Sequence, residues 1–192
     1  MSEVRTGGLL SCLLVTGLVA AGLALTGCGA EGGGKQPVQS AIPRVPNPKD
    51  VTAVADRPCA LLPPPQAAGF GLDRPPRQIS GRLGTADCEW RSSRMDVWVY
   101  LSLATDRLTL EEVSTRRESL PYFELTEIGG HPAIASRTDA KLPACDIDIK
   151  TAERQSVTVS YDSTAFNNDL AQGCVVARQV AAAVLRNLPP RT

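Results

Sequence analysis

Three pairs of short stretches along the chain alternate apolar with polar residues, and each pair surrounds a polar or glycine-rich turn. The pairs are 88–91 with 96–103, 122–128 with 133–137, and 145–150 with 156–161. Alternation with a period of two is typical of β-strands that bury one face. The pattern therefore predicts antiparallel hairpins that belong to a sheet of about five to six strands.

Two other stretches repeat apolar residues every three to four positions, which is the period of an amphipathic α-helix. The first begins near Thr109 and stops before Pro121, and the second begins at Asn168 or Asp169 and stops at paired prolines. A short helix is also expected within residues 58–71. This order of elements predicts an α+β fold, in which helices, including a long C-terminal one, pack against an antiparallel sheet.

The strand at 97–103 has two faces of different character. Its valines and leucines share one face, whereas Trp98 and Tyr100 fall on the other. That second face is either covered by a helix or presents an aromatic surface. Arg91 and Arg94 are near in sequence, and guanidinium groups pair with phosphate and stack on aromatic rings. We therefore interpret these four side chains as candidates for a groove that takes an anionic glycolipid or a wall polymer.

The N-terminal part of the chain is one uncharged, mostly apolar run, residues 6–30, preceded by Arg5. This layout is typical of a secretory signal sequence, although its length also suffices for a membrane-spanning helix. The tetrapeptide Leu-Thr-Gly-Cys at 25–28 resembles the lipobox of bacterial lipoproteins. The resemblance implies cleavage after Gly27, a lipid on Cys28, and anchoring at the extracytoplasmic face of the cell membrane.

These features divide the chain into three parts. Residues 1–27 are expected to be a lipoprotein signal peptide, and residues 56–192 a disulfide-linked extracytoplasmic α+β domain. Between them, residues 28–55 contain a glycine run followed by spaced prolines. Glycine and spaced proline both resist packing, so this part is expected to be a flexible tether.

The cysteines fall into two groups. Two lie in or just after the apolar run, and four are spread through the remaining sequence: Cys12 and Cys28, then Cys59, Cys88, Cys145 and Cys174. An exported protein reaches an oxidising compartment, and the sequence has no CxxC pair and a single histidine. The oxidising compartment and the lack of typical metal-ligand spacing favour two disulfides over a metal site. No cofactor is implied. Three pairings are open, and we favour nearest neighbours, which close loops of about 30 residues.

Charge gives no indication of a nucleic-acid partner. Lysine and arginine total 20, and aspartate and glutamate also total 20. A protein with this balance has no field that would attract a polyanion.

Candidates for catalysis are few. His131 stands between Gly130 and Pro132, which is typical of an exposed turn residue. Asp146 and Asp148 are two residues apart and therefore share one strand face, as a carboxylate pair for hydrolysis does. We interpret that face as solvated, and no residue is assigned as catalytic.

An ordered set of motifs resembles actinobacterial lipoproteins grouped as domain of unknown function 3558 (DUF3558). The motifs are the lipobox cysteine, Pro-Cys-Ala-Leu-Leu at 58–62, Cys-Glu-Trp at 88–90, Ile-Gly-Gly-His-Pro-Ala at 128–133, Cys-Asp-Ile at 145–147, and Gly-Cys at 173–174 before an alanine-rich stretch. The resemblance implies a cell-envelope lipoprotein of high-G+C Gram-positive bacteria without established catalytic residues.

The sequence thus favours a lipid-anchored, non-enzymatic domain that binds an envelope lipid, a wall polymer or a protein. Two alternatives stay open. One is an envelope hydrolase that uses His131 or the Asp146 and Asp148 pair. The other is an accessory subunit of an envelope complex.

Overall fold

The structure is a computed structural model, and it describes most of the sequence that follows the predicted lipobox. The described residues are 42–81, 85–107, 109–142, 144–164 and 170–192. The predicted signal peptide, the lipidation site and the first part of the predicted tether lie outside these residues. The predicted start of the long C-terminal helix also lies outside them.

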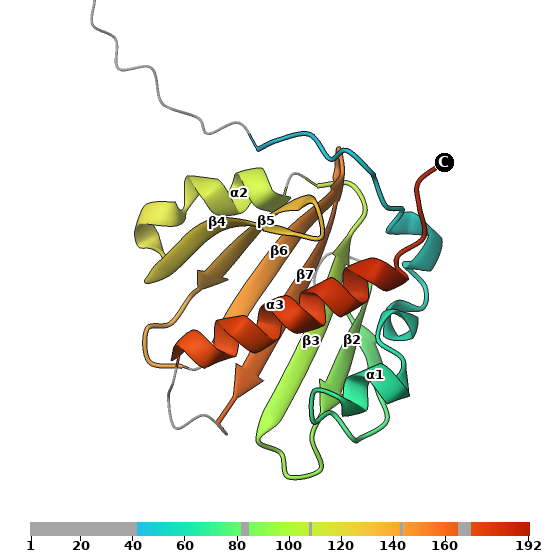
Figure 1. Cartoon of the computed structure of the whole chain (residues 1–192), viewed down its shortest axis with the longest axis vertical. Helices are drawn as coiled ribbons and strands as arrows, with labels where there is room; N and C mark the ends of the chain where they lie inside the picture. Colours follow the sequence, from blue (N-terminus) through green and yellow to red (C-terminus); the bar gives the residue numbers. More distant parts are fainter. Residues whose placement is uncertain (1–41, 82–84, 108, 143, 165–169) are drawn as a thin grey trace, which may run out of the picture. The chain divides into compact units, whose positions relative to one another are not determined.

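One seven-stranded antiparallel sheet forms the centre of the domain (Figure 1). Its strands are β1 (Arg77–Ser80), β2 (Ala86–Arg91), β3 (Val97–Ala104), β4 (Tyr122–Ile128), β5 (His131–Arg137), β6 (Ala144–Ala152) and β7 (Gln155–Ser163). Their order across the sheet is β1-β2-β3-β7-β6-β5-β4. The three predicted hairpins are confirmed as β2–β3, β4–β5 and β6–β7.

The edge strand β1 was not predicted. Its four residues, Arg-Gln-Ile-Ser, include one apolar side chain, and only that side chain is partly buried. A strand this short and this exposed has no alternation of apolar residues, so its pairing with β2 determines its structure.

The long helix α3 (Leu170–Asn187) crosses one face of the sheet, which we call the α3 face (Figure 1). Its buried side chains recur at helical spacing and are mostly small, among them Ala177, Val180, Ala181 and Val184, and the buried Leu188 follows the helix directly. They pack on the odd-numbered residues of the central strands, such as Leu101, Ile147 and Val159, which are all fully buried. Burying an aliphatic side chain stabilises the fold by roughly 1.5–3 kcal/mol, so this layer is the main core.

The opposite side of the sheet, the α2 face, is only partly covered. Helix α2 (Thr109–Thr115) and the 3₁₀ turn η3 (Arg117–Ser119) follow β3, and α2 contacts β5, β6 and β7. Leu110 and Val113 pack there on Ile134 and form a second, smaller core. On β2 and β3 the residues of this face remain partly exposed, except for Glu89 and Ala104.

The predicted helix within residues 58–71 is broken. The segment forms a 3₁₀ turn, η2 (Pro58–Leu61), and a five-residue helix, α1 (Pro64–Ala68). Pro63 between them is extended, because the prolines after it can only begin a new helix. Leu61 and Leu62 are nonetheless buried, and the Leu62 carbonyl accepts a hydrogen bond from Trp90 Nε1 at 3.2 Å.

Both disulfides join a flanking element to the α3 face of the sheet. Cys59 of η2 pairs with Cys88 of β2, and Cys145 of β6 pairs with Cys174 of α3. The favoured nearest-neighbour pairing is therefore confirmed. The α+β class, the sheet and the long C-terminal helix are confirmed as well.

The folded domain begins earlier than the predicted boundary at residue 56. Val51 is fully buried, Val54 nearly so, and both lie at the 3₁₀ turn η1 (Thr52–Val54). The backbone N–H of Val51 donates to Gln155 Oε1 at 2.8 Å. The last part of the predicted tether is thus a packed segment, because its valines find the apolar core in spite of the neighbouring prolines.

The two ends of the described sequence meet beside the sheet. Lys49 and Pro190 form an antiparallel bridge. The N–H of Asp50 donates to the Pro189 carbonyl, and the N–H of Arg191 donates to the Pro48 carbonyl, both at 2.9 Å.

Candidate functional site

A row of polar side chains crosses the α2 face where α2 does not cover it. Register places Glu89 of β2 beside Tyr100 of β3, Tyr100 beside Ser160 of β7, and Ser160 beside Asp146 of β6. Residues directly opposite each other in an antiparallel pair point to the same face. The row of polar side chains is therefore continuous across four neighbouring strands.

Glu89 organises one end of this row. It is 5% exposed and accepts hydrogen bonds from Arg91 Nη2 at 2.8 Å and Arg77 Nη2 at 3.0 Å. Burial raises the pKa of Glu89, but the hydrogen bond from Arg91 and those from its other neighbours outweigh burial and hold the pKa below its usual value. The carboxylate thus stays ionised and fixes the orientation of Arg91.

Three of the four predicted groove residues lie together on this surface. Arg91 stands opposite Trp98, and Tyr100 is next but one to Trp98 on the same strand. Arg94 is separate, because it belongs to the turn between β2 and β3, is 81% exposed, and pairs with Asp96 at 3.3 Å. We call Arg91, Trp98 and Tyr100 the aromatic-basic surface.

The interpretation of Asp146 and Asp148 as solvated is wrong for Asp148. Asp148 is 4% exposed, and Thr158 Oγ1 donates to its Oδ1 at 2.6 Å. Burial, more than any other cause, raises its pKa to about 6, and burial also raises the pKa of Asp146. The reason is tertiary, since α2 packs on β6 and removes that part of the face from water.

His131 is buried, so its interpretation as an exposed turn residue is wrong as well. It begins β5, is 3% exposed, and its Nδ1 lies 3.1 Å from the Lys150 carbonyl. Burial lowers its pKa more than that hydrogen bond raises it. Register puts His131 on the α3 face and the carboxylate pair on the α2 face. The two cannot act on one substrate at one site, since the sheet separates them.

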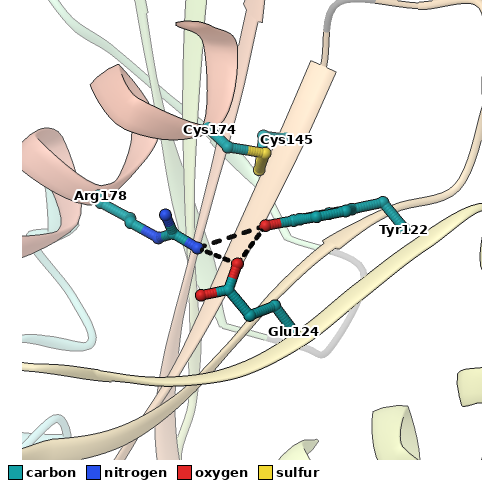
Figure 2. Close-up of a disulfide and its surroundings, with 5 residues drawn as sticks. All are labelled: Tyr122, Glu124, Cys145, Cys174 and Arg178. Carbon is teal, nitrogen blue, oxygen red and sulfur yellow. Dashed lines mark hydrogen bonds and ion pairs between the residues drawn. A yellow bond between two sulfur atoms is a disulfide. The ribbon is translucent and has the colours of Figure 1, made fainter. Parts of the chain in front are cut away.

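A second polar cluster lies beside the Cys145–Cys174 disulfide on the α3 face. Figure 2 shows Arg178 of α3 reaching Tyr122 and Glu124 of β4. Arg178 Nη2 is 2.6 Å from Glu124 Oε2 and 3.3 Å from the Tyr122 hydroxyl, and that hydroxyl also donates to Glu124. The hydrogen bond from Tyr122 is the largest cause of the lowered pKa of Glu124.

Sequence reasoning missed this cluster. Its members are 54 residues apart or more between β4 and α3, so no local spacing connects them. The sequence contains one local signal, which is that Tyr122 and Glu124 are two residues apart and therefore share one face of a strand.

A groove of about 650 Å³ lies between α2, the β4–β5 hairpin and residues 42–46. Its walls include Ile42, Arg44, Leu110 and the exposed Leu125. It was not predicted, because its N-terminal wall belongs to the segment interpreted as a tether. None of the four predicted groove residues lines it.

Within the described ranges, no three His, Cys, Asp or Glu side chains are grouped so that they could hold a metal ion. Over the same ranges, no helix has the length and the hydropathy needed to cross a membrane.

The fold and these surfaces define a disulfide-linked α+β domain built on one antiparallel sheet with polar clusters on both faces. The family model described as "Protein of unknown function (DUF3558)" matches residues 23–187, and the protein belongs to that family. The resemblance to this family is therefore confirmed. No curated protein and no solved structure matches the sequence.

Proposed function

We propose that the protein is an actinobacterial cell-envelope lipoprotein, held at the extracytoplasmic face of the membrane by a lipid on Cys28. Its domain binds an envelope ligand or protein and does not catalyse a reaction. The observation that carries this proposal is the state of the four domain cysteines, which form two disulfides. Disulfides of this kind persist outside the reducing cytosol, so they support export.

The anchor is supported by the lipobox resemblance at 25–28. Two or more acyl groups hold a protein stably at a membrane, whereas one group does so only marginally. The glycine-rich composition of residues 29–34 is typical of a spacer between an anchor and a domain.

The aromatic-basic surface supports a binding role. Trp98 and Tyr100 are half-buried, so each packs against the domain and is still partly exposed to solvent. Arg91 is held by Glu89, which removes the entropy cost of ordering it when a partner binds. Aromatic and arginine side chains on a rigid scaffold are the usual anchors of binding surfaces.

Mass spectrometry of the full-length protein expressed in an actinobacterial host tests the anchor. The mature N-terminus is expected at Cys28 with a diacylglycerol mass on its sulfur, and the protein is expected in the membrane fraction. Cys28→Ala should abolish both, while the matched change Cys12→Ala should leave both intact. An unmodified Cys28, or retention of residues 1–27, would contradict the proposal.

Titration of the purified protein with envelope lipids, wall-polymer fragments and envelope proteins tests the binding role. Trp98→Ala should lower the affinity for a ligand that the unchanged protein retains by about tenfold or more, as loss of an aromatic anchor does. Met95→Ala, an exposed apolar residue in the neighbouring turn, is the control. Absence of any retained ligand would count against a binding domain and favour the accessory-subunit alternative, which crosslinking in cells examines directly.

An envelope hydrolase is the second candidate, and the observation that favours it is the neighbouring pair Asp146 and Asp148, of which Asp148 is buried. A carboxyl with a pKa of about 6 can hold a proton near neutral pH, as a general acid must. His131 does not belong to this hypothesis, because it lies on the other face. Hydrolysis of wall polymers that is unchanged in Asp148→Asn would exclude this use of the pair.

A further inference from the structure

Unpaired guanidinium nitrogens concentrate at one place on the α3 face. Six side-chain nitrogen or oxygen atoms of the described residues are shielded from solvent and have no hydrogen-bond partner. Three of the six belong to Arg137 and Arg178: Nε and Nη1 of Arg137, and Nε of Arg178. A buried N–H donor without an acceptor is costly, so such a concentration needs a physical explanation.

The two arginines meet at a shared tyrosine. Arg137 stands directly opposite Tyr122 in the β4–β5 pair, so both side chains project from the same face. The guanidinium carbon of Arg137 lies 5.4 Å from the centre of the Tyr122 ring. Arg178 approaches the same residue from α3 and contacts its hydroxyl at 3.3 Å (Figure 2). Stacking on the ring restrains Arg137 but leaves its Nε and Nη1 without a hydrogen-bond acceptor.

The charges of this cluster do not balance. Arg178 is paired with Glu124 at 2.6 Å, whereas none of the ion pairs of the described residues includes Arg137. Two guanidinium groups and one carboxylate leave one positive charge in a half-buried place. Such a place favours an anion that brings its own acceptor oxygens.

We infer that Arg137, Arg178 and Tyr122 form a binding site for a phosphate group, and that Arg137 is its principal ligand. These three nitrogen atoms carry four N–H bonds, because each Nε has one and Nη1 has two. The oxygens of a phosphate group are arranged tetrahedrally, so they can accept hydrogen bonds from two arginines on different elements, whereas the two oxygens of a carboxylate lie in one plane. A phosphodiester also carries one negative charge, which matches the one positive charge of the cluster. The Cys145–Cys174 disulfide fixes the position of α3 and thereby the distance between the two arginines.

The phosphate can belong to a phospholipid headgroup or be free in solution. This site lies on the α3 face, away from the aromatic-basic surface, and the inference does not require lipidation of Cys28. If the proposed lipid anchor is disproved, the phosphate site is unaffected. If the phosphate site is disproved, the proposed anchor is unaffected.

Thermal unfolding of the full-length protein at constant ionic strength tests the site. Inorganic phosphate should raise Tm in a saturable manner, and chloride or acetate should not, because a ligand that binds only the folded state stabilises it. Arg137→Gln should weaken phosphate binding by about tenfold or more, since it removes charge-assisted hydrogen bonds. The exposed Arg94→Gln is the matched control and should bind phosphate like the unchanged protein.

Arg137→Lys serves as a second variant if Arg137→Gln does not fold. It keeps the charge but loses the planar fork, so it should bind more weakly than the unchanged protein and more tightly than Arg137→Gln. Co-sedimentation with vesicles distinguishes the sources. Binding to phosphatidylglycerol vesicles that depends on Arg137 indicates a headgroup, and binding of inorganic phosphate alone indicates a free ion.

Three results would overturn the inference. The first is a combination of two negative findings: phosphate raises Tm no more than chloride does, and vesicle binding does not depend on Arg137. That combination would mean that water alone solvates the arginines. The second is equal stabilisation by acetate, which indicates a carboxylate site. The third is phosphate binding that is unchanged in Arg137→Gln.

Discussion

Asp148 titrates in the buried space beneath α2, and burial links its protonation to folding. Its pKa is about 6 in the folded protein against an ordinary 3.8. The folded state therefore binds more protons than the unfolded state between these values, so the free energy of unfolding falls as pH rises through them. The full difference corresponds to about 3 kcal/mol, and the raised pKa of Asp146 acts in the same direction.

Asp148→Asn is expected to remove this pH dependence. The free energy of unfolding, measured by denaturant titration from pH 4 to pH 8, should fall with rising pH in the unchanged protein and be flatter in the variant. At pH 7.5 the variant should be the more stable of the two by about 1–3 kcal/mol, because no buried charge forms. Asp139→Asn, at an exposed position, is the control and should follow the unchanged protein. A variant that keeps the full slope would show that Asp148 does not cause it.

Residue environments were the least predictable feature of this protein. The alternation around Asp148 correctly predicted its strand and its face, but burial comes from α2, which is distant in sequence. The Gly-His-Pro motif suggested a turn, yet His131 is the first residue of β5 and faces the core. Which polar positions are covered depends on how elements dock, and a local pattern does not contain that information.

Elements were more predictable, because their signals are local. Alternating residues predicted the three hairpins, and a helical repeat predicted α3. The strand β1 and the packed segment around Val51 were missed. Both depend on pairing with distant parts of the sequence, and neither has a strong apolar period of its own.

The disulfides should stabilise two different elements by similar amounts. Each joins residues 29 positions apart, so the chain-entropy model gives the same contribution for both, about 3–4 kcal/mol. Replacing Cys145 and Cys174 together by alanine, and separately Cys59 and Cys88, should each lower the free energy of unfolding by that amount. Denaturant titration of the two variants measures it.

Each double variant serves as the control for the other, because the two disulfides close loops of equal length. An excess loss for the pair that joins β6 to α3 would measure the contribution of that link to helix docking. A loss well below about 1 kcal/mol for both variants would contradict the assignment of the disulfides as the main cross-links of the fold.

At the scale of the whole molecule, the folded unit extends N-terminally beyond the predicted boundary. A truncated protein that begins at Asp56 lacks Val51 and Val54, whose side chains are buried, and the hydrogen bond from Val51 to Gln155. Removing two buried valines costs roughly 3 kcal/mol or more. The protein that begins at Asp56 should therefore have a Tm lower by about 10 °C than one that begins at Ile42.

Differential scanning calorimetry of both truncated proteins and of the full-length protein measures this effect. The protein that begins at Ile42 should melt like the full-length one. Equal Tm values for the two truncated proteins would show that residues 42–55 do not contribute to the folded unit.

The meeting of the two ends also determines how the domain responds to mechanical force. Lys49 and Pro190 form an antiparallel bridge, and the two ends leave this bridge on the same side. A force that pulls the ends apart therefore breaks the hydrogen bonds around the bridge one after another. The load then reaches Cys59 from one side and Cys174 from the other. Each disulfide carries tension past the segment it encloses, residues 60–87 and 146–173, so these segments stay unstretched. The load path therefore runs through residues 89–144, which include β3, α2, β4 and β5, so these strands resist the force before any of that part extends.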